Sequence, residues 1–216
     1  MIPHVDRRTL EVARAAAVLE AGERLAHRVA ARQAGIAREP KAARFLGVQA
    51  RQEAFHARVF ASAARLLAPK VTVANPAQAA LAALASRLDS DLDAGELWPS
   101  VVGLQVALEA LGQAVLDELE GVVAQHVPAL APLHSLLARQ EAAHRAFGTR
   151  CVARAIECGE LTPARLRGAT RDYDALVGEL LMACAEVLDG LGVPYERYAE
   201  RFEAALPRWF RVAASA

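Results

Sequence analysis

Two copies of one short string place a carboxylate and an imidazole at the same helical spacing. Residues 51–56 read Arg-Gln-Glu-Ala-Phe-His and residues 139–144 read Arg-Gln-Glu-Ala-Ala-His. Side chains three positions apart on a helix are surface neighbours, roughly 5–6 Å apart at Cβ. Each string therefore directs a glutamate and a histidine, Glu53 with His56 and Glu141 with His144, toward one point in space.

A glutamate also lies upstream of each string, within a second repeated pattern. The segments that begin at Glu23 and Glu109 both read Glu, any residue, Leu, small, polar, any residue, Val. A duplicated pair of helices explains both repeats. The repeat alignment favours Glu23 as the partner of Glu109, whereas the distance along the chain to Glu53 leaves Glu20 as the alternative. His27, one turn beyond Glu23, is a further candidate as a ligand or as a residue that supports one.

Together these positions supply four carboxylates and two imidazoles, which can bind two metal ions between four helices. Two divalent cations would nearly neutralise four carboxylates, which would otherwise be costly to bury. Mixed oxygen and nitrogen ligands suit iron or manganese, and the chain has no Cys-x-x-Cys pair for a thiolate site. The competing interpretation is ordinary Glu and His pairs on a helix surface. The apolar residues on the same helical faces disfavour it, among them Leu46, Ala50, Val106 and Leu137.

Proline and glycine positions divide the chain into helical blocks, and no segment shows the alternation typical of strands. Long helices are expected over residues 9–33, 40–67, 99–123 and 132–158. A short helix is expected over 76–88 and a loop over 89–96. The tail should hold helices over 172–188 and 195–209. The long connection between the second and third long helices is typical of bundles with one crossover. The sequence therefore predicts an all-α fold.

The ordered pattern Glu, Glu-x-x-His, Glu, Glu-x-x-His resembles that of the ferritin-like di-iron carboxylate superfamily, and the resemblance covers residues 20–144. It implies a four-helix bundle with a long crossover that holds two iron ions, with manganese-containing pairs as alternatives, and Glu53 and Glu141 as bridging ligands. The helices expected in the tail, which the resemblance does not cover, add two extra C-terminal helices. One domain over residues 1–216 is therefore expected, with a di-metal bundle at 8–158 and a helical tail at 161–216 packed on it. The metal ligands implied by the resemblance are Glu23 (or Glu20), Glu53, His56, Glu109, Glu141 and His144.

Among ferritin-like functions, an oxidase or oxygenase that uses O2 to oxidise a small organic molecule is favoured. The long tail and crossover could close a substrate pocket. Gly112, one turn past Glu109, leaves room beside the metals, either for a substrate or oxygen pocket or for close packing of helices. Such an enzyme needs an external electron donor, a ferredoxin or reductase. The alternatives are a ferroxidase or peroxide-reducing protein, and a binding protein with a degenerate site. All three tyrosines lie in the tail, which disfavours a tyrosyl radical beside the metals.

Composition disfavours several other partners. The chain has 25 basic and 25 acidic residues, so net charge gives no reason to expect nucleic acid or an anionic membrane as a partner. No apolar run approaches the roughly 18 residues of a membrane span. Three cysteines make no disulfide framework, and a cytoplasmic location is expected. A homodimer is the expected assembly on general frequency.

Overall fold

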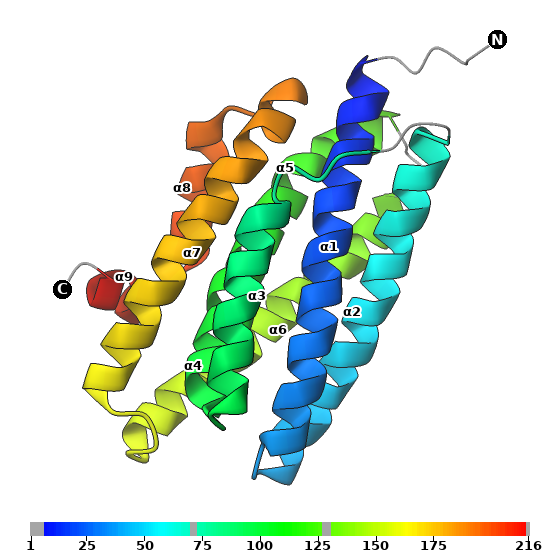
Figure 1. Cartoon of the computed structure of the whole chain (residues 1–216). Helices are drawn as coiled ribbons and strands as arrows, with labels where there is room; N and C mark the ends of the chain where they lie inside the picture. Colours follow the sequence, from blue (N-terminus) through cyan, green and yellow to red (C-terminus); the bar gives the residue numbers. More distant parts are fainter. Residues whose placement is uncertain (1–6, 70–72, 127–130, 215–216) are drawn as a thin grey trace.

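The computed structural model describes residues 7–69, 73–126 and 131–214, and within these ranges it contains helices and no strand. The first two helices, α1 (Arg7–Ile36) and α2 (Pro40–Leu67), form an antiparallel pair that packs along most of its length. Residues 73–77 then pass across α1 to reach α3 (Gln78–Asp93), as Figure 1 shows. The all-helical class predicted from the sequence is confirmed.

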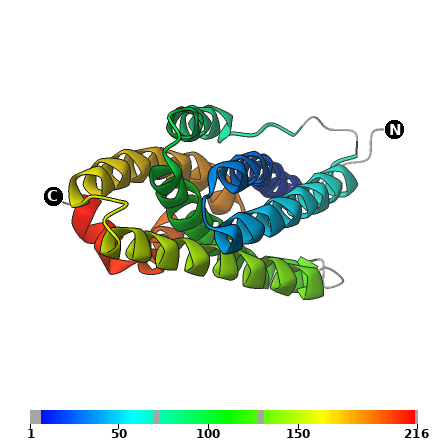
Figure 2. The same cartoon turned by 90° about the horizontal axis from the view of Figure 1, so that it is seen from below.

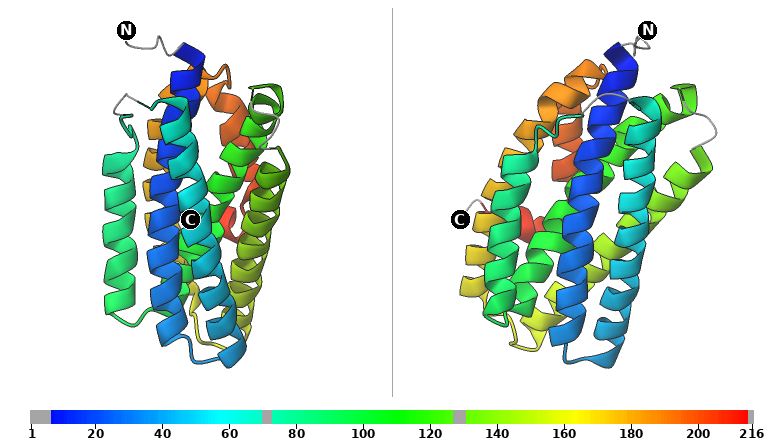
Figure 3. Two further views of the ribbon diagram at one scale, coloured as in Figure 1. Left: turned by 90° about the vertical axis from the view of Figure 1, so that its right-hand side faces the viewer. Right: turned by 45° about the vertical axis from the view of Figure 1, so that its right-hand side comes forward.

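A second set of helices completes the bundle. The chain returns through α4 (Leu97–Val101), the π-helical segment η1 (Val102–Leu108) and α5 (Glu109–His126), and α6 (Ala131–Glu157) packs against α5 and η1. Helices α3 and α6 lie on opposite faces of the molecule (Figure 2). The long helices run roughly parallel or antiparallel to one another (Figure 3). Residues far apart in sequence can therefore meet between them.

The C-terminal helices share the core of the bundle. Helix α7 (Pro163–Gly190) packs against η1, α1 and α3, while α8 (Tyr195–Ala205) packs on α5 and α9 (Arg208–Ala214) packs on α7. Tyr173 of α7 is fully buried, and its hydroxyl donates to Asp91 of α3 at 2.5 Å. The tail thus contributes wall and core to the structure that holds the candidate site.

Local sequence explains where several helices begin and end. Pro40 and Pro163 occupy first-turn positions, where a missing N–H costs nothing, and the Thr162 hydroxyl accepts a hydrogen bond from the Arg165 N–H. Three helices, α3, α6 and α7, are followed by glycines with φ near 75°, a left-handed conformation that side chains disfavour. These glycines are Gly95 (72°), Gly159 (73°) and Gly192 (78°).

Three predicted boundaries were wrong for identifiable reasons. The predicted loop at 89–96 is helical through Asp93, because Asp91 and Leu92 are buried on one face of α3 and the Tyr173 hydroxyl donates to Asp91. On the outer face, Arg32 of α1 pairs with Asp89 and Asp93. The tail helix begins at Pro163, nine residues earlier than predicted, behind its Thr162 cap. The predicted helix over 195–209 is broken at Leu206, whose ψ of 138° is the extended conformation required before Pro207.

The predicted helix over 99–123 is not a regular α-helix, because it contains the π-helical segment η1. Such segments add a residue to the turn and often occur at functional sites. Here η1 ends directly before Glu109, and all seven of its residues are buried. Helix α6 approaches it closely at Gly148, where an added Cβ would lie 2.3 Å from the Cβ of Gln105. The glycine therefore permits the contact that sets η1 against α6.

Gly148→Ala is expected to lower the free energy of unfolding by about 1–2 kcal/mol. The added methyl would also lie 3.2 Å from the backbone carbonyl carbon of Gln105, so a rotamer change cannot relieve the clash. Overpacking of this kind costs about 1–3 kcal/mol, which exceeds the helix propensity gained. Urea unfolding tests this, with Gly178→Ala on α7 as the control, because no atom lies within 4 Å of the Cβ added there. Equal stability of the two variants would contradict the prediction.

The expectation that no run is long and apolar enough to cross a membrane was wrong by length and composition, because the described ranges contain one such helical run, Leu97–Gly121. Within its most apolar window, 89% of the residues are buried inside the protein. Its hydropathy is accounted for by burial against the surrounding helices.

Candidate metal centre

Six buried carboxylate and imidazole side chains meet between four helical segments. One comes from α1, two from α2, one from the first residue of α5 and two from α6. They form two groups whose candidate ligand atoms lie within 4.8 Å of one another. The first group is Glu23, Glu53, His56 and Glu141, and the second is Glu53, Glu109 and His144. The structure thus brings together all six residues that the sequence pattern singles out.

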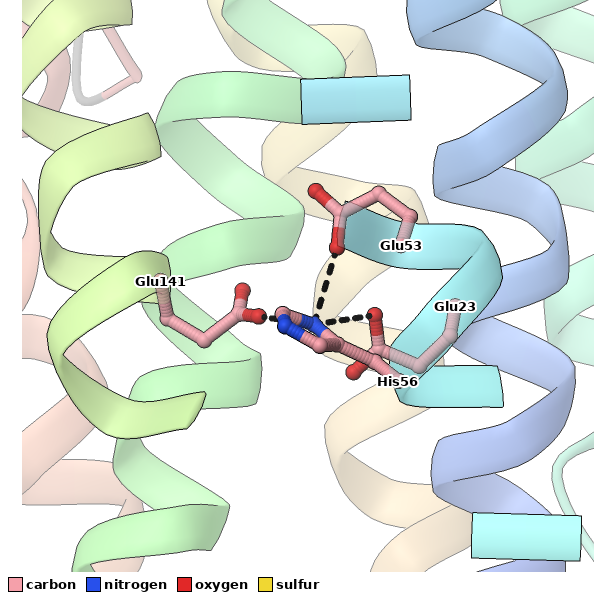
Figure 4. Close-up of side chains that lie close together, drawn as sticks. All are labelled: Glu23, Glu53, His56 and Glu141. Atoms are coloured by element: carbon pink, nitrogen blue, oxygen red, sulfur yellow. Dashed lines mark ion pairs between the residues drawn. The ribbon is translucent and has the colours of Figure 1, made fainter. Parts of the chain in front are cut away.

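The first group surrounds one nitrogen of His56. Its Nδ1 lies 3.0 Å from Glu141 Oε1 and 3.1 Å from Glu53 Oε2. A third carboxylate oxygen, Glu23 Oε2, lies 3.4 Å away. Figure 4 shows these three side chains reaching His56 from α1, α2 and α6. Four ligands from three helices therefore share one small volume.

The second group is centred on the other histidine. His144 Nδ1 lies 3.0 Å from Glu53 Oε1 and 3.8 Å from Glu109 Oε1. Glu53 uses one oxygen toward each histidine, so it belongs to both groups, as a bridging ligand would. Glu141 belongs to the first group only, although its charge acts on Glu109 and raises the pKa of that carboxyl group. The ring centroids of His56 and His144 are 6.4 Å apart, so the two groups occupy separate, adjoining positions.

Glutamines of the repeated strings fix the histidines reciprocally. His56 Nε2 on α2 donates to Gln140 Oε1 on α6 at 2.7 Å, and His144 Nε2 on α6 donates to Gln52 Oε1 on α2 at 2.8 Å. With its proton on Nε2, each neutral ring has a lone pair on Nδ1, the atom that faces the carboxylates. Sequence reasoning missed these glutamines. The signal was present, because both strings repeat the Gln as well as the Glu and His.

A buried chain of amides supports the carboxylates. Gln49 Nε2 donates to Glu109 at 2.7 Å and to Glu53 at 3.0 Å. Gln105 of η1 donates to Gln49 at 3.1 Å and to Gln33 at 2.6 Å. All three glutamines are fully buried. A connected network of this kind holds its members in one arrangement, so η1 and α1 help to orient two of the carboxylates.

Burial and mutual repulsion act on the protonation of the cluster. Burial raises the pKa of Glu23 well above its usual range, the charge of Glu141 raises it further, and His56 opposes the shift. Burial and the charges of Glu141 and Glu53 likewise raise the pKa of Glu109. Burial would also raise the pKa of Glu53, but close contacts with His144 and His56 outweigh it and lower this pKa. The site therefore favours positive charge at its centre.

That positive charge can be supplied by a protonated histidine or by a metal ion. Burial lowers the pKa of His56, but the contacts with Glu141, Glu23 and Glu53 outweigh burial and raise it. The Nδ1 atoms of both histidines are buried without a hydrogen-bonding partner, although carboxylate oxygens lie within ion-pair distance. Buried polar atoms normally have partners. A metal ion would satisfy these nitrogens and displace protons from the cluster, so the residues fit a metal-binding role.

Two further candidates from the sequence lie outside the cluster. Glu20 pairs with Arg24 one turn away, and 21% of its side-chain surface is exposed. His27 is exposed, and its Nδ1 lies 2.7 Å from the carbonyl oxygen of Ala50 on α2. Of the two alternatives on the first helix, the structure therefore places Glu23 among the candidate ligands.

Glu23→Ala is expected to lose at least one metal ion per chain, whereas Glu20→Ala should keep the metal content of the unmodified protein. Glu23 contributes an oxygen 3.4 Å from His56 Nδ1, and Glu20 contributes none to either group. Elemental analysis of the two variants after identical loading provides the comparison. Loss of metal from Glu20→Ala alone would reverse the assignment.

An apolar cavity of about 70 Å³ adjoins the cluster. It lies between α1, α5 and α7, and the carboxylates Glu23, Glu109 and Glu141 line its inner end. Gly112, predicted from the sequence to leave room beside the metals, is part of its wall, and no atom lies within 4 Å of a Cβ added there. A small molecule in this cavity would be next to the candidate ligands.

No protein-family model matches the chain, and no curated protein matches it.

Proposed function

We propose that the protein is a ferritin-like di-iron carboxylate protein in which α1, α2, η1 with α5, and α6 form the four-helix bundle. Two buried groups of ligands that share Glu53 support this proposal, because they suit two adjoining cations. Carboxylate and imidazole ligands without thiolate suit iron, and manganese accepts the same set. Glu23, Glu53, His56 and Glu141 would hold one ion, and Glu53, Glu109 and His144 the other.

The function that this site supports best is that of an oxidase or oxygenase acting on a small organic substrate. Bound ferrous ions would supply electrons for the reduction of O2. The observation that carries the proposal is the apolar cavity beside Glu23, Glu109 and Glu141. A protein that only stored iron would have no need of an apolar, water-poor space at its metal ligands. Turnover would need an external reductase or ferredoxin.

The residues of the chain would act by positioning and by exclusion of water. Gln52 and Gln140 keep a proton on His144 Nε2 and His56 Nε2, which leaves each Nδ1 free to bind metal. Gln49 orients the Glu53 and Glu109 carboxylates. Leu180 and Val187 of α7 line the cavity and limit access of water to it.

The test is anaerobic loading with ferrous iron, followed by metal analysis and measurement of O2 consumption. About two iron ions per chain and rapid O2 uptake are expected. Uptake that stops after one equivalent without reductant, and resumes with reductant, is expected of an oxidase. Assembly into a cage-sized particle that keeps accumulating iron would instead favour a ferroxidase and storage function. Failure to bind metal would contradict both.

A further inference from the structure

The cavity beside the candidate ligands is lined mainly by apolar side chains. Apart from the three candidate ligand carboxylates, the side chains that line it are aliphatic residues, glycines and one thiol. That thiol, Cys184 of α7, is buried, and burial raises its pKa to about 12, so it stays uncharged. Among the described residues that line the cavity, none has a basic or amide side chain. A charged group on a ligand would therefore lose its hydration without gaining a partner along the wall.

The size and opening of the cavity restrict the shape of a ligand. Its volume of about 70 Å³ is well below the roughly 150 Å³ of a cavity that holds benzene. Leu180, Cys184 and Val187 form a buried wall, whereas Leu19, Gly22 and Gly112 are partly exposed. The cavity therefore runs inward from the surface between α1 and α5 to the carboxylates. A space of this size holds only part of a ligand, so a narrow chain that enters at one end and extends out through the mouth fits it better than a ring does.

Two glycines create much of this space. Gly22 on α1 and Gly112 on α5 both line the cavity, and no atom lies within 4 Å of a Cβ added at either position. Both lie inside helices, where alanine would be more stable by about 1 kcal/mol. Neither glycine has a positive φ, so backbone conformation does not require it. The space that they leave is the feature that a ligand would use.

We propose that this cavity binds the substrate, and that the substrate is an uncharged, unbranched aliphatic chain whose reacting end reaches the carboxylate cluster. The proposal rests on the proposed function, since the metal site would perform the oxidation. The cavity itself is built by the side chains of α1, α5 and α7, so ligand binding can be measured separately from metal binding.

Calorimetric titration with hexanol, cyclohexanol and hexanoate tests the proposal on the metal-free protein and on the protein loaded with redox-inert zinc. Hexanol should bind best in both states. Gly112→Ala and Gly22→Ala should each weaken hexanol binding by about fourfold, since each added methyl removes space for about one methylene of the ligand. The double variant should bind more than tenfold more weakly.

Gly178→Ala is the matched control, because it adds a methyl to a helix at a glycine outside the cavity. It should leave hexanol affinity unchanged, and none of the alanine variants should melt at a lower temperature than the unmodified protein. Equal or tighter binding of cyclohexanol or hexanoate would overturn the proposed substrate class. Unchanged hexanol affinity in Gly22→Ala/Gly112→Ala would overturn the cavity as its site. Hexanol binding without zinc stoichiometry would contradict the metal proposal and leave the cavity assignment standing.

Discussion

Glu53→Gln/Glu141→Gln is expected to reduce metal binding from about two ions per chain to none. Glu53 belongs to both ligand groups, and Glu141 Oε1 lies 3.0 Å from His56 Nδ1. The amide removes the charge that offsets a cation while it keeps the volume and most hydrogen bonds of the carboxylate. Each position would keep one imidazole and a single carboxylate, Glu23 with His56 and Glu109 with His144, so a divalent ion at either would leave a buried net positive charge, which is costly.

The experiment is elemental analysis after anaerobic loading, with circular dichroism to confirm the helical fold. The apo variant should be folded, because the substitution relieves repulsion that raises the pKa of Glu23 and Glu109. A suitable control is Glu157→Gln/Glu179→Gln, which removes two exposed carboxylates of α6 and α7. Full metal loading of the Glu53 and Glu141 variant would refute the site.

Gln140→Leu and Gln52→Leu are each expected to weaken metal affinity by about 10–100-fold. Each leucine removes the acceptor for a histidine Nε2–H, at 2.7 Å for His56 and 2.8 Å for His144. The ring is then free to rotate, or to move its proton to Nδ1, and both changes take the lone pair away from the metal position. The carboxylates themselves remain in place.

Competition between the protein and a chelator for cobalt or zinc measures this effect. Gln140→Glu should restore affinity, because a carboxylate accepts the same hydrogen bond, and this rescue distinguishes positioning from a general packing defect. Gln113→Leu is the control, since the amide of Gln113 donates to Asp117 on the same helix. Affinities of Gln140→Leu and Gln52→Leu within a factor of two or so of the control would contradict the assigned role.

The reciprocal contacts of the glutamines show which features of the site the repeated strings predict and which depend on helix packing. The spacing of Glu53 and His56 on one helix follows from helical geometry, and so does that of Glu141 and His144. The pairing of Gln52 with His144, and of Gln140 with His56, depends on how α2 and α6 face each other. The repeat signalled that these glutamines matter, but no local rule links a side chain to one on another helix.

The sequence by itself determined the helical class and five of the six candidate ligands, namely Glu53, His56, Glu109, Glu141 and His144, because helix periodicity and i, i+3 spacing are local properties of the chain. It also favoured Gly112 as a source of space beside the ligands. Only the tertiary structure decided between Glu20 and Glu23, because two residues one turn apart differ mainly in the rotation of α1 about its axis. The same holds for the π-helical segment before Glu109 and for the cavity closed by α7. Those features arise from close packing between helices that are far apart in the sequence. At Gly148 against Gln105, for example, the fit of the two helix surfaces determines the backbone conformation.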